Sequence, residues 1–186
     1  TAFDGIRHYW LVDDPANGID GGGNAPTAAP VASARMRMAG AGNSVNALND
    51  IDWSTDPGNL RIVVNPGTYA KLLQLPEVVT LEKYGAGATI VTGELARLWG
   101  IPIIAPAYAP KTEADGKLSA APANNTLGQL SIVNVRGWLR GVYRPVTLYF
   151  DRIQRTDTFL VELYTRVAFT RWGGDVAAGI RNLASD

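Results

Sequence analysis

The chain has 186 residues, of which 46 % are hydrophobic and 18 % are charged, so it is long enough and apolar enough to fold around its own core. Lysine plus arginine and aspartate plus glutamate each number 17, which makes the formal net charge zero, and no global field draws the protein onto nucleic acid or an anionic membrane. The sequence contains no cysteine, which excludes disulfides, thiolate metal sites and a cysteine nucleophile.

The first part of the chain is predicted to be a loop followed by a short helix. Residues 17–42 are rich in glycine, proline and alanine, and the first half of this stretch is predicted to be a flexible loop. Residues 31–48 have a pattern compatible with a short helix. Gly40 and Gly42 weaken that helix, because each costs about 1 kcal/mol relative to alanine in a helix interior.

A buried strand and a second helix are predicted next. Residues 60–64 form a compact run of apolar and β-branched residues, which Asn-Pro-Gly at 65–67 ends with a turn. Thr68 is placed to cap a helix over residues 69–75.

Two short strands and a long loop follow. The strands are predicted at residues 89–91 and 101–105, and Pro102 favours an edge position or a strand start for the second. Residues 105–125 are polar and rich in proline and alanine, and loops of this length are usually functional or mobile.

The last third of the chain is dominated by strands. Apolar and polar residues alternate over residues 130–135, 138–143, 146–150 and 159–169. In the last of these segments one face collects Phe159, Val161, Leu163, Thr165, Val167 and Phe169. That spacing predicts a long, half-buried strand.

No residue pattern indicates catalysis or metal binding. His8 is the only histidine, no Gly-x-Ser-x-Gly elbow is present, and a structural or surface role is expected for this side chain. The carboxylates of Asp50, Asp52 and Asp56 lack the closing glutamate of a calcium loop, so turn and capping roles are expected. The sequence therefore predicts no catalytic residue, metal ligand, cofactor or small-molecule substrate, and no apolar run approaches the roughly 20 residues that span a membrane.

Charge is distributed unevenly along the chain. Residues 136–171 contain seven arginines and three carboxylates, a net charge of +4. Arginine suits contacts between charged surfaces and also contacts with phosphate, so an interface and a solvated strand face both remain open. Residues 1–93 carry a net charge of −3 and residues 94–186 a net charge of +3, which favours head-to-tail association of identical copies.

The order of three segments resembles the major capsid proteins of tailed bacteriophages, which have the Hong Kong 97-like fold. The first segment runs from Ile62 through Asn65-Pro66-Gly67 to Leu72, the second spans residues 93–99, and the third is Gly100-Ile101-Pro102-Ile103-Ile104. The resemblance covers residues 49–183 and ends in a turn at 151–157 that leads into a long strand.

This resemblance implies an α+β fold with an axial domain at residues 49–146. Residues 1–48 and 147–186 would belong to the peripheral domain. Subunit contacts are then expected on the loop at residues 105–125, which we call the axial loop, and beside the long strand, at Lys111, Glu113, Asp115, Lys117, Arg152, Arg155 and Asp157. No segment fits the family's N-terminal arm, projecting hairpin loop or spine helix, and the sequence has no initiator methionine. We therefore expect a piece of a longer protein that is monomeric or weakly associated at micromolar concentration.

The function implied by the resemblance is structural. Copies of the chain would form pentamers and hexamers of an icosahedral head, assembled in the bacterial cytoplasm, with only non-specific contacts to packaged DNA on the inner face. An encapsulin-like nanocompartment shell protein is the first alternative. A small hydrolase or transferase that uses His8 is the second.

Overall fold

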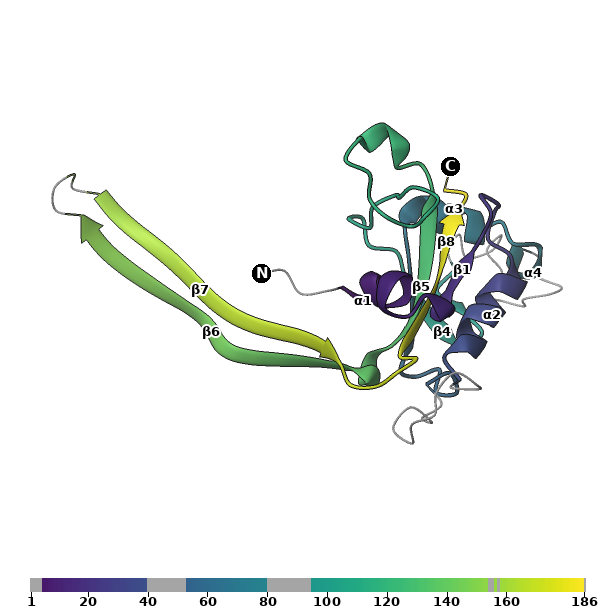
Figure 1. Ribbon diagram of the computed structural model, residues 1–186, viewed down its shortest axis with the longest axis horizontal. Helices are drawn as coiled ribbons and strands as arrows, with labels where there is room; N and C mark the ends of the chain where they lie inside the picture. Colours follow the sequence, from purple (N-terminus) through teal and green to yellow (C-terminus); the bar gives the residue numbers. More distant parts are fainter. Residues whose placement is uncertain (1–4, 40–52, 80–94, 154–155, 157, 186) are drawn as a thin grey trace.

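The computed structural model describes residues 5–39, 53–79, 95–153, 156 and 158–185. In this part of the chain a body built on a six-stranded sheet carries a long two-stranded ribbon that extends away from it (Figure 1). The helices are α1 (Ile6–His8), α2 (Ala28–Arg37), α3 (Pro66–Leu72) and α4 (Pro76–Val79). The strands are β1 (Gly18–Asp20), β2 (Leu60–Val64), β3 (Arg97–Leu98), β4 (Ile101–Ile104), β5 (Gly128–Asn134), β6 (Trp138–Ile153), β7 (Thr158–Arg171) and β8 (Ala177–Leu183).

The sheet of the body has the strand order β1-β8-β5-β2-β4-β3. The central pairs β2–β5 and β5–β8 are antiparallel, whereas β4 pairs with β2 and β1 pairs with β8 in parallel. The strands predicted at residues 60–64 and 101–105 are confirmed as β2 and β4. The strand predicted at residues 89–91 lies outside the described residues.

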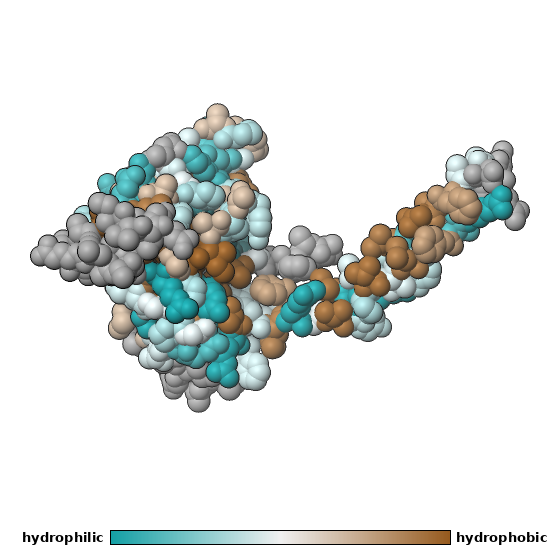
Figure 2. All heavy atoms as spheres, turned by 180° about the vertical axis from the view of Figure 1, so that it is seen from behind, coloured by the Kyte–Doolittle hydropathy of each residue, from teal (hydrophilic) through white to brown (hydrophobic). Residues whose placement is uncertain are grey.

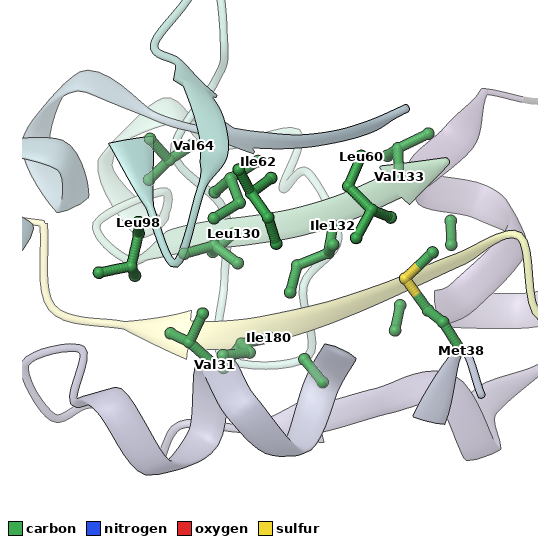
Figure 3. Packing of buried hydrophobic residues seen from close by; sticks show 14 of the residues in the cluster. Val31, Met38, Leu60, Ile62, Val64, Leu98, Leu130, Ile132, Val133 and Ile180 are labelled. Atoms are coloured by element: carbon green, nitrogen blue, oxygen red, sulfur yellow. The ribbon is translucent and has the colours of Figure 1, made fainter. Parts of the chain in front are cut away.

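One face of this sheet forms the core. Leu60, Ile62, Leu130, Ile132 and Ile180 are fully buried there. Helix α2 covers them with a further set of buried side chains (Figure 3), namely Val31, Ala34 and Met38.

The other face is covered by the beginning of the chain. Trp10, in a π-helical turn over Tyr9–Asp13, is fully buried, and its Nε1 donates to Ser131 Oγ at 3.0 Å. The indole lies so close to Gly179 of β8 that a Cβ atom there would meet the Cε2 of Trp10 at 2.2 Å. Glycine at position 179 thus allows the N-terminal turn to pack directly on the sheet.

The glycine-rich stretch is more ordered than predicted. Instead of a flexible loop, residues 18–20 form β1, which joins the sheet through the register Gly18↔Gly179. A three-residue strand gives too short an alternation to be recognised in the sequence, and it is stabilised by its pairing with the distant strand β8 and by a hydrogen bond from Arg37 Nη1 to the carbonyl oxygen of Gly18. Helix α2 confirms part of the helix predicted at residues 31–48, although it begins at Ala28; residues 40–48 lie outside the described residues.

The predicted cap at Thr68 is wrong. Helix α3 begins at Pro66, with Asn65 at the N-cap position, because proline lacks an N–H and fits the first helical turn. Thr68 therefore lies inside the helix, where its Oγ1 donates to the carbonyl oxygen of Ala184 at 3.1 Å.

The ribbon is formed by β6 and β7, which pair in antiparallel fashion from Trp138↔Arg171 to Ile153↔Thr158. The sequence predicted two strands where β6 is one, because Pro145 interrupts the pattern. The pairing shifts register on both sides of Arg144, and β6 has a free edge that tolerates the missing N–H of proline. The sequence predicted strands in this region but not that they would extend away from the body as a ribbon.

Strand β7 is not half-buried as predicted, since almost all of its residues are exposed. The alternation that the sequence shows is real. It divides the ribbon into an apolar and a polar face, but no described element covers either face along the distal ribbon.

Candidate interaction surface

The most unusual surface of the molecule is the apolar side of the ribbon. It consists of Val142, Leu148 and Phe150 from β6 and Phe159, Val161, Leu163 and Val167 from β7, which we call the apolar face. These side chains are 37–72 % exposed, and Figure 2 shows the apolar colour continuing along the ribbon.

Strand pairing gathers these residues on one side. Leu148 lies opposite Leu163 and Phe150 opposite Val161, and alternate residues of a strand share a face. A two-stranded hairpin is only marginally stable alone in water, and a large exposed apolar patch marks an interaction site. The apolar face is therefore the strongest candidate for a contact surface.

The opposite side of the ribbon carries a basic cluster. Arg144 and Arg166 are register partners, and like charges directly opposite each other are destabilising. The guanidinium carbon of Arg144 lies 5.4 Å from the ring centroid of Tyr149 and 5.8 Å from that of Tyr164, and Arg144 Nη2 donates to the Tyr149 hydroxyl. Two aromatic rings thus hold one of the arginines in place.

The hydroxyl of Tyr164 in this cluster donates to Glu162. That hydrogen bond, followed by the negative charge of Glu162, raises the pKa of Tyr164 above its usual value. Tyr164 consequently stays protonated. Its hydrogen bond engages the carboxylate of Glu162, which would otherwise be available to pair with Arg144 or Arg166.

Only one of the three contact residues predicted near the ribbon tip can be located. Arg152 is exposed, and its guanidinium carbon lies 5.8 Å from the ring centroid of Phe159. Arg155 and Asp157 lie outside the described residues.

Three of the four residues predicted on the axial loop, Glu113, Asp115 and Lys117, are brought together in one tight turn. The backbone N–H of Glu113 donates to the carbonyl oxygen of Lys117 at 2.9 Å, and the N–H of Lys117 donates to Asp115 Oδ1 at 2.8 Å. Lys111 and Glu113 are half-buried, whereas Asp115 and Lys117 are exposed. The carboxylate of Asp115 therefore helps to stabilise the loop itself, and Asp115 and Lys117 are the two members exposed to solvent.

The axial loop also contains an exposed aromatic residue that the sequence analysis missed. Tyr108 is 87 % exposed, and aromatic side chains are enriched at protein interfaces. A lone tyrosine in a proline-rich loop has no periodicity that would reveal its exposure, so only the structure shows it.

His8 lies at the surface, about 40 % exposed, with Nε2 3.5 Å from Asp13 Oδ1. It borders an open pocket of about 340 Å³, whose described lining is Gly5, Arg7, His8, Leu11, Val12, Gly116, Lys117 and Leu118. That lining provides no hydroxyl nucleophile for a histidine base to activate. Across the described residues no cluster of three potential metal ligands is found, and none of the helices described is long and apolar enough to cross a membrane.

Comparison with protein-family models gives no match, and neither does comparison with curated proteins. Solved structures do match. The capsid of cyanophage P-SCSP1u has a TM-score of 0.56 at 20 % identity, covering 91 % of this chain and 54 % of that one. A chain from Mycobacterium phage Che8 gives 0.56 at 15 % identity with the same coverage. The SrpI encapsulin of Synechococcus elongatus PCC 7942 gives 0.52 at 15 % identity, covering 97 % of this chain and 59 % of that one.

The chain therefore has an α+β fold of the Hong Kong 97-like type, which it shares with phage capsid proteins and with an encapsulin. It spans little more than half the length of these structures. At such low identity the likeness establishes the fold.

Proposed function

We propose that this chain is part of the major capsid protein of a tailed bacteriophage, which assembles with copies of itself into the pentamers and hexamers of an icosahedral head. The observation that carries the proposal is the fold match to phage capsid chains over 91 % of the sequence. The protein resides in the virion, assembles in the bacterial cytoplasm and does no bond-making chemistry.

The exposed apolar face supports this role, because a shell subunit needs extended surfaces that are buried only on assembly. Charge supports it as well. The ribbon, residues 138–171, contains six arginines and three carboxylates, a net charge of +3, and the rest of the chain carries −3. Identical copies can therefore meet with the ribbon of one against the body of the next, and such heterologous contacts close into rings.

We assign the contacts between copies to two regions. Lys111, Glu113, Asp115 and Lys117 of the axial loop meet neighbouring subunits around the ring axis. Arg152, Arg155 and Asp157 meet subunits farther out, together with the opposed pair Arg144 and Arg166. Contacts with packaged DNA are made to its phosphates, which carry no sequence information, and are therefore non-specific.

Sedimentation velocity over a concentration series tests the proposal. The expected result is weak, reversible association above micromolar concentration, which Phe150→Asp in the apolar face abolishes. The matched control is Met36→Asp on α2, because Met36 is 63 % exposed and Phe150 is 72 % exposed. A chain that stays monomeric at all concentrations, or associates equally in both variants, would contradict self-assembly through the ribbon.

An encapsulin-like compartment shell is the second candidate, and the match to SrpI, covering 97 % of this chain, favours it specifically. The neighbouring genes distinguish a phage head from a compartment shell. A terminase and a portal gene would indicate a phage head, and a peroxidase or ferritin-like gene would indicate a compartment that encloses an enzyme.

A further inference from the structure

The ribbon is attached to the body at one end through two short connections. Residues 135–137 lead from β5 into β6, and residues 172–176 lead from β7 into β8. From this attachment the strands extend away from the sheet (Figure 1), so a small rotation at the base moves the far end a long way. At about 3.3 Å per residue, 14 residues make a lever of roughly 46 Å.

Tyr9, from the N-terminal turn, lies against the first residue pair of this lever. Its ring meets the indole of Trp138 edge-on, with centroids 6.2 Å apart and planes at 84°. The guanidinium carbon of Arg171 lies 4.5 Å from the same ring centroid. Trp138 and Arg171 are register partners, so one aromatic ring contacts both strands of the ribbon at its base.

Trp138 is in turn fixed from the ribbon side. Its indole stacks on Phe169 with centroids 5.0 Å apart and planes at 6°. This stacking fixes the Trp138 indole against the ribbon.

The hydroxyl of Tyr9 holds the second connection. It accepts a hydrogen bond from the backbone N–H of Asp175 at 2.8 Å and one from Asn17 Nδ2 at 3.3 Å. Asn17 Nδ2 also donates to Asp175 Oδ1 at 2.8 Å. Asp175 has a φ of 53°, a conformation uncommon for residues other than glycine, and this network compensates for it.

These groups are withdrawn from solvent. Tyr9 is 2 % exposed and Asn17 1 %, and burial raises the pKa of the Tyr9 phenol. The phenol therefore stays neutral, and the hydrogen bonds to its oxygen persist at physiological pH.

We infer that Tyr9 is the centre of an aromatic pivot, formed with Trp138, Arg171 and Asp175, that holds the ribbon at one angle to the sheet. The ring fixes the two strands and the hydroxyl fixes the returning connection. The pivot determines the direction in which the apolar face is presented, and it operates in a single chain whether or not the chain forms a shell.

Distances between two spin labels, measured by pulsed electron paramagnetic resonance in dilute solution, test the pivot. The sequence has no cysteine, so Ser33→Cys on α2 and Thr158→Cys at the far end of the ribbon can be labelled selectively; both positions are exposed. The unaltered pivot gives one narrow distance distribution. Arg171→Leu removes the cation–π contact and increases the population outside that peak about tenfold, and Tyr9→Phe, which removes the hydroxyl, broadens the peak as well.

Two controls make the result specific. Tyr143→Leu removes a ribbon tyrosine that is 85 % exposed, and it leaves the distribution unchanged. A second label pair within the ribbon, Val142→Cys with Thr158→Cys, also stays unchanged, because loosening the pivot does not bend the ribbon itself.

Unchanged body-to-ribbon distances in both Arg171→Leu and Tyr9→Phe would overturn the inference, and so would equal broadening of the pair within the ribbon. If Tyr9→Phe unfolds the body, as judged by circular dichroism, Arg171→Leu decides alone. Its side chain is on the ribbon and exposed, so its removal leaves the core intact.

Discussion

The body and the ribbon use the same alternation of side chains with opposite results. In β2 the alternating residues Leu60, Ile62 and Val64 are at most 1 % exposed, because β5 and β8 continue the sheet and α2 covers it. In β7 the alternating residues Phe159 and Leu163 are 71 % and 67 % exposed. Alternation of apolar and polar residues thus indicates that a strand has two chemically different faces. Whether the apolar face is buried depends on whether another helix or strand packs against it.

Replacing one leucine in each region gives the largest expected difference. Leu130→Ala leaves a cavity in the core, where the side chain is fully buried, and lowers the free energy of unfolding by about 2–5 kcal/mol. Leu163→Ala on the apolar face changes it by less than about 0.5 kcal/mol. Urea unfolding of dilute protein measures both values, and equal losses would show that the apolar face is covered within the single chain.

Two glycines in strands sharpen the same comparison. Gly179→Ala places a Cβ atom 2.2 Å from Trp10 Cε2, and this overpacking costs about 1–3 kcal/mol. In Gly141→Ala on the ribbon the nearest atom is the Cβ of Ala168 at 3.9 Å, so the new methyl group fits and the restricted unfolded chain stabilises the protein by about 0.4–1 kcal/mol. Thermal unfolding should move in opposite directions for the two variants, and a shift in the same direction would contradict the packing of Trp10 on β8.

Hydrogen bonds should follow the same division between body and ribbon. Ser131→Ala leaves the buried Nε1 of Trp10 without its acceptor, which costs about 1–3 kcal/mol. Thr165→Val removes the bond from Oγ1 to the carbonyl oxygen of Arg144, but water replaces it because the ribbon is exposed. Urea unfolding measures both variants. If Thr165→Val lowered the free energy of unfolding as much as Ser131→Ala does, solvent would not reach this part of the ribbon.

Residues close together in sequence made much of the body predictable. The apolar runs at residues 60–64 and 101–105 predict β2 and β4. The order of these elements around Asn65-Pro66 predicted the fold class that the structural matches support. The start of α3 was misplaced by three residues, because the preference of proline for the first helical turn outweighed the capping tendency of Thr68.

What the sequence missed depends on contacts between distant residues. Strand β1 pairs with β8, which lies about 160 positions later. The pivot joins Tyr9 to Trp138 and Arg171, and no pattern in a single sequence links those positions. Of the predicted contact residues, Glu113, Asp115 and Lys117 do come together in one turn, yet their role between copies remains a prediction.

The smallest expected effects concern pH, and the two regions should respond at opposite ends of the scale. Hydrogen bonds from the N–H of Gly22 and from Asn182 Nδ2 lower the pKa of Asp20 in the body. Its stabilising contribution is therefore present above the unfolded-state pKa and lost as the pH falls through the lower folded-state value. On the ribbon, the hydrogen bond to Glu162 raises the pKa of Tyr164. The contribution of Tyr164 to stability is therefore present below its unfolded-state pKa and lost as the pH rises through the higher folded-state value.

Glu162→Gln isolates the ribbon effect. The neutral amide still accepts a hydrogen bond from Tyr164 but no longer repels the phenolate, so the tyrosine pKa falls toward its usual value, as followed by the ultraviolet absorbance of tyrosinate. Asp20→Asn is the matched change in the body, and it flattens the acid side of the stability curve without altering the tyrosine titration. Because Asp20 and Tyr164 are both exposed, solvent screens these interactions and both shifts are small. An unchanged alkaline titration in Glu162→Gln would show that the cluster of Arg144, Glu162 and Tyr164 does not persist in solution, and with it the preorganised arginine on the polar side of the ribbon would be lost.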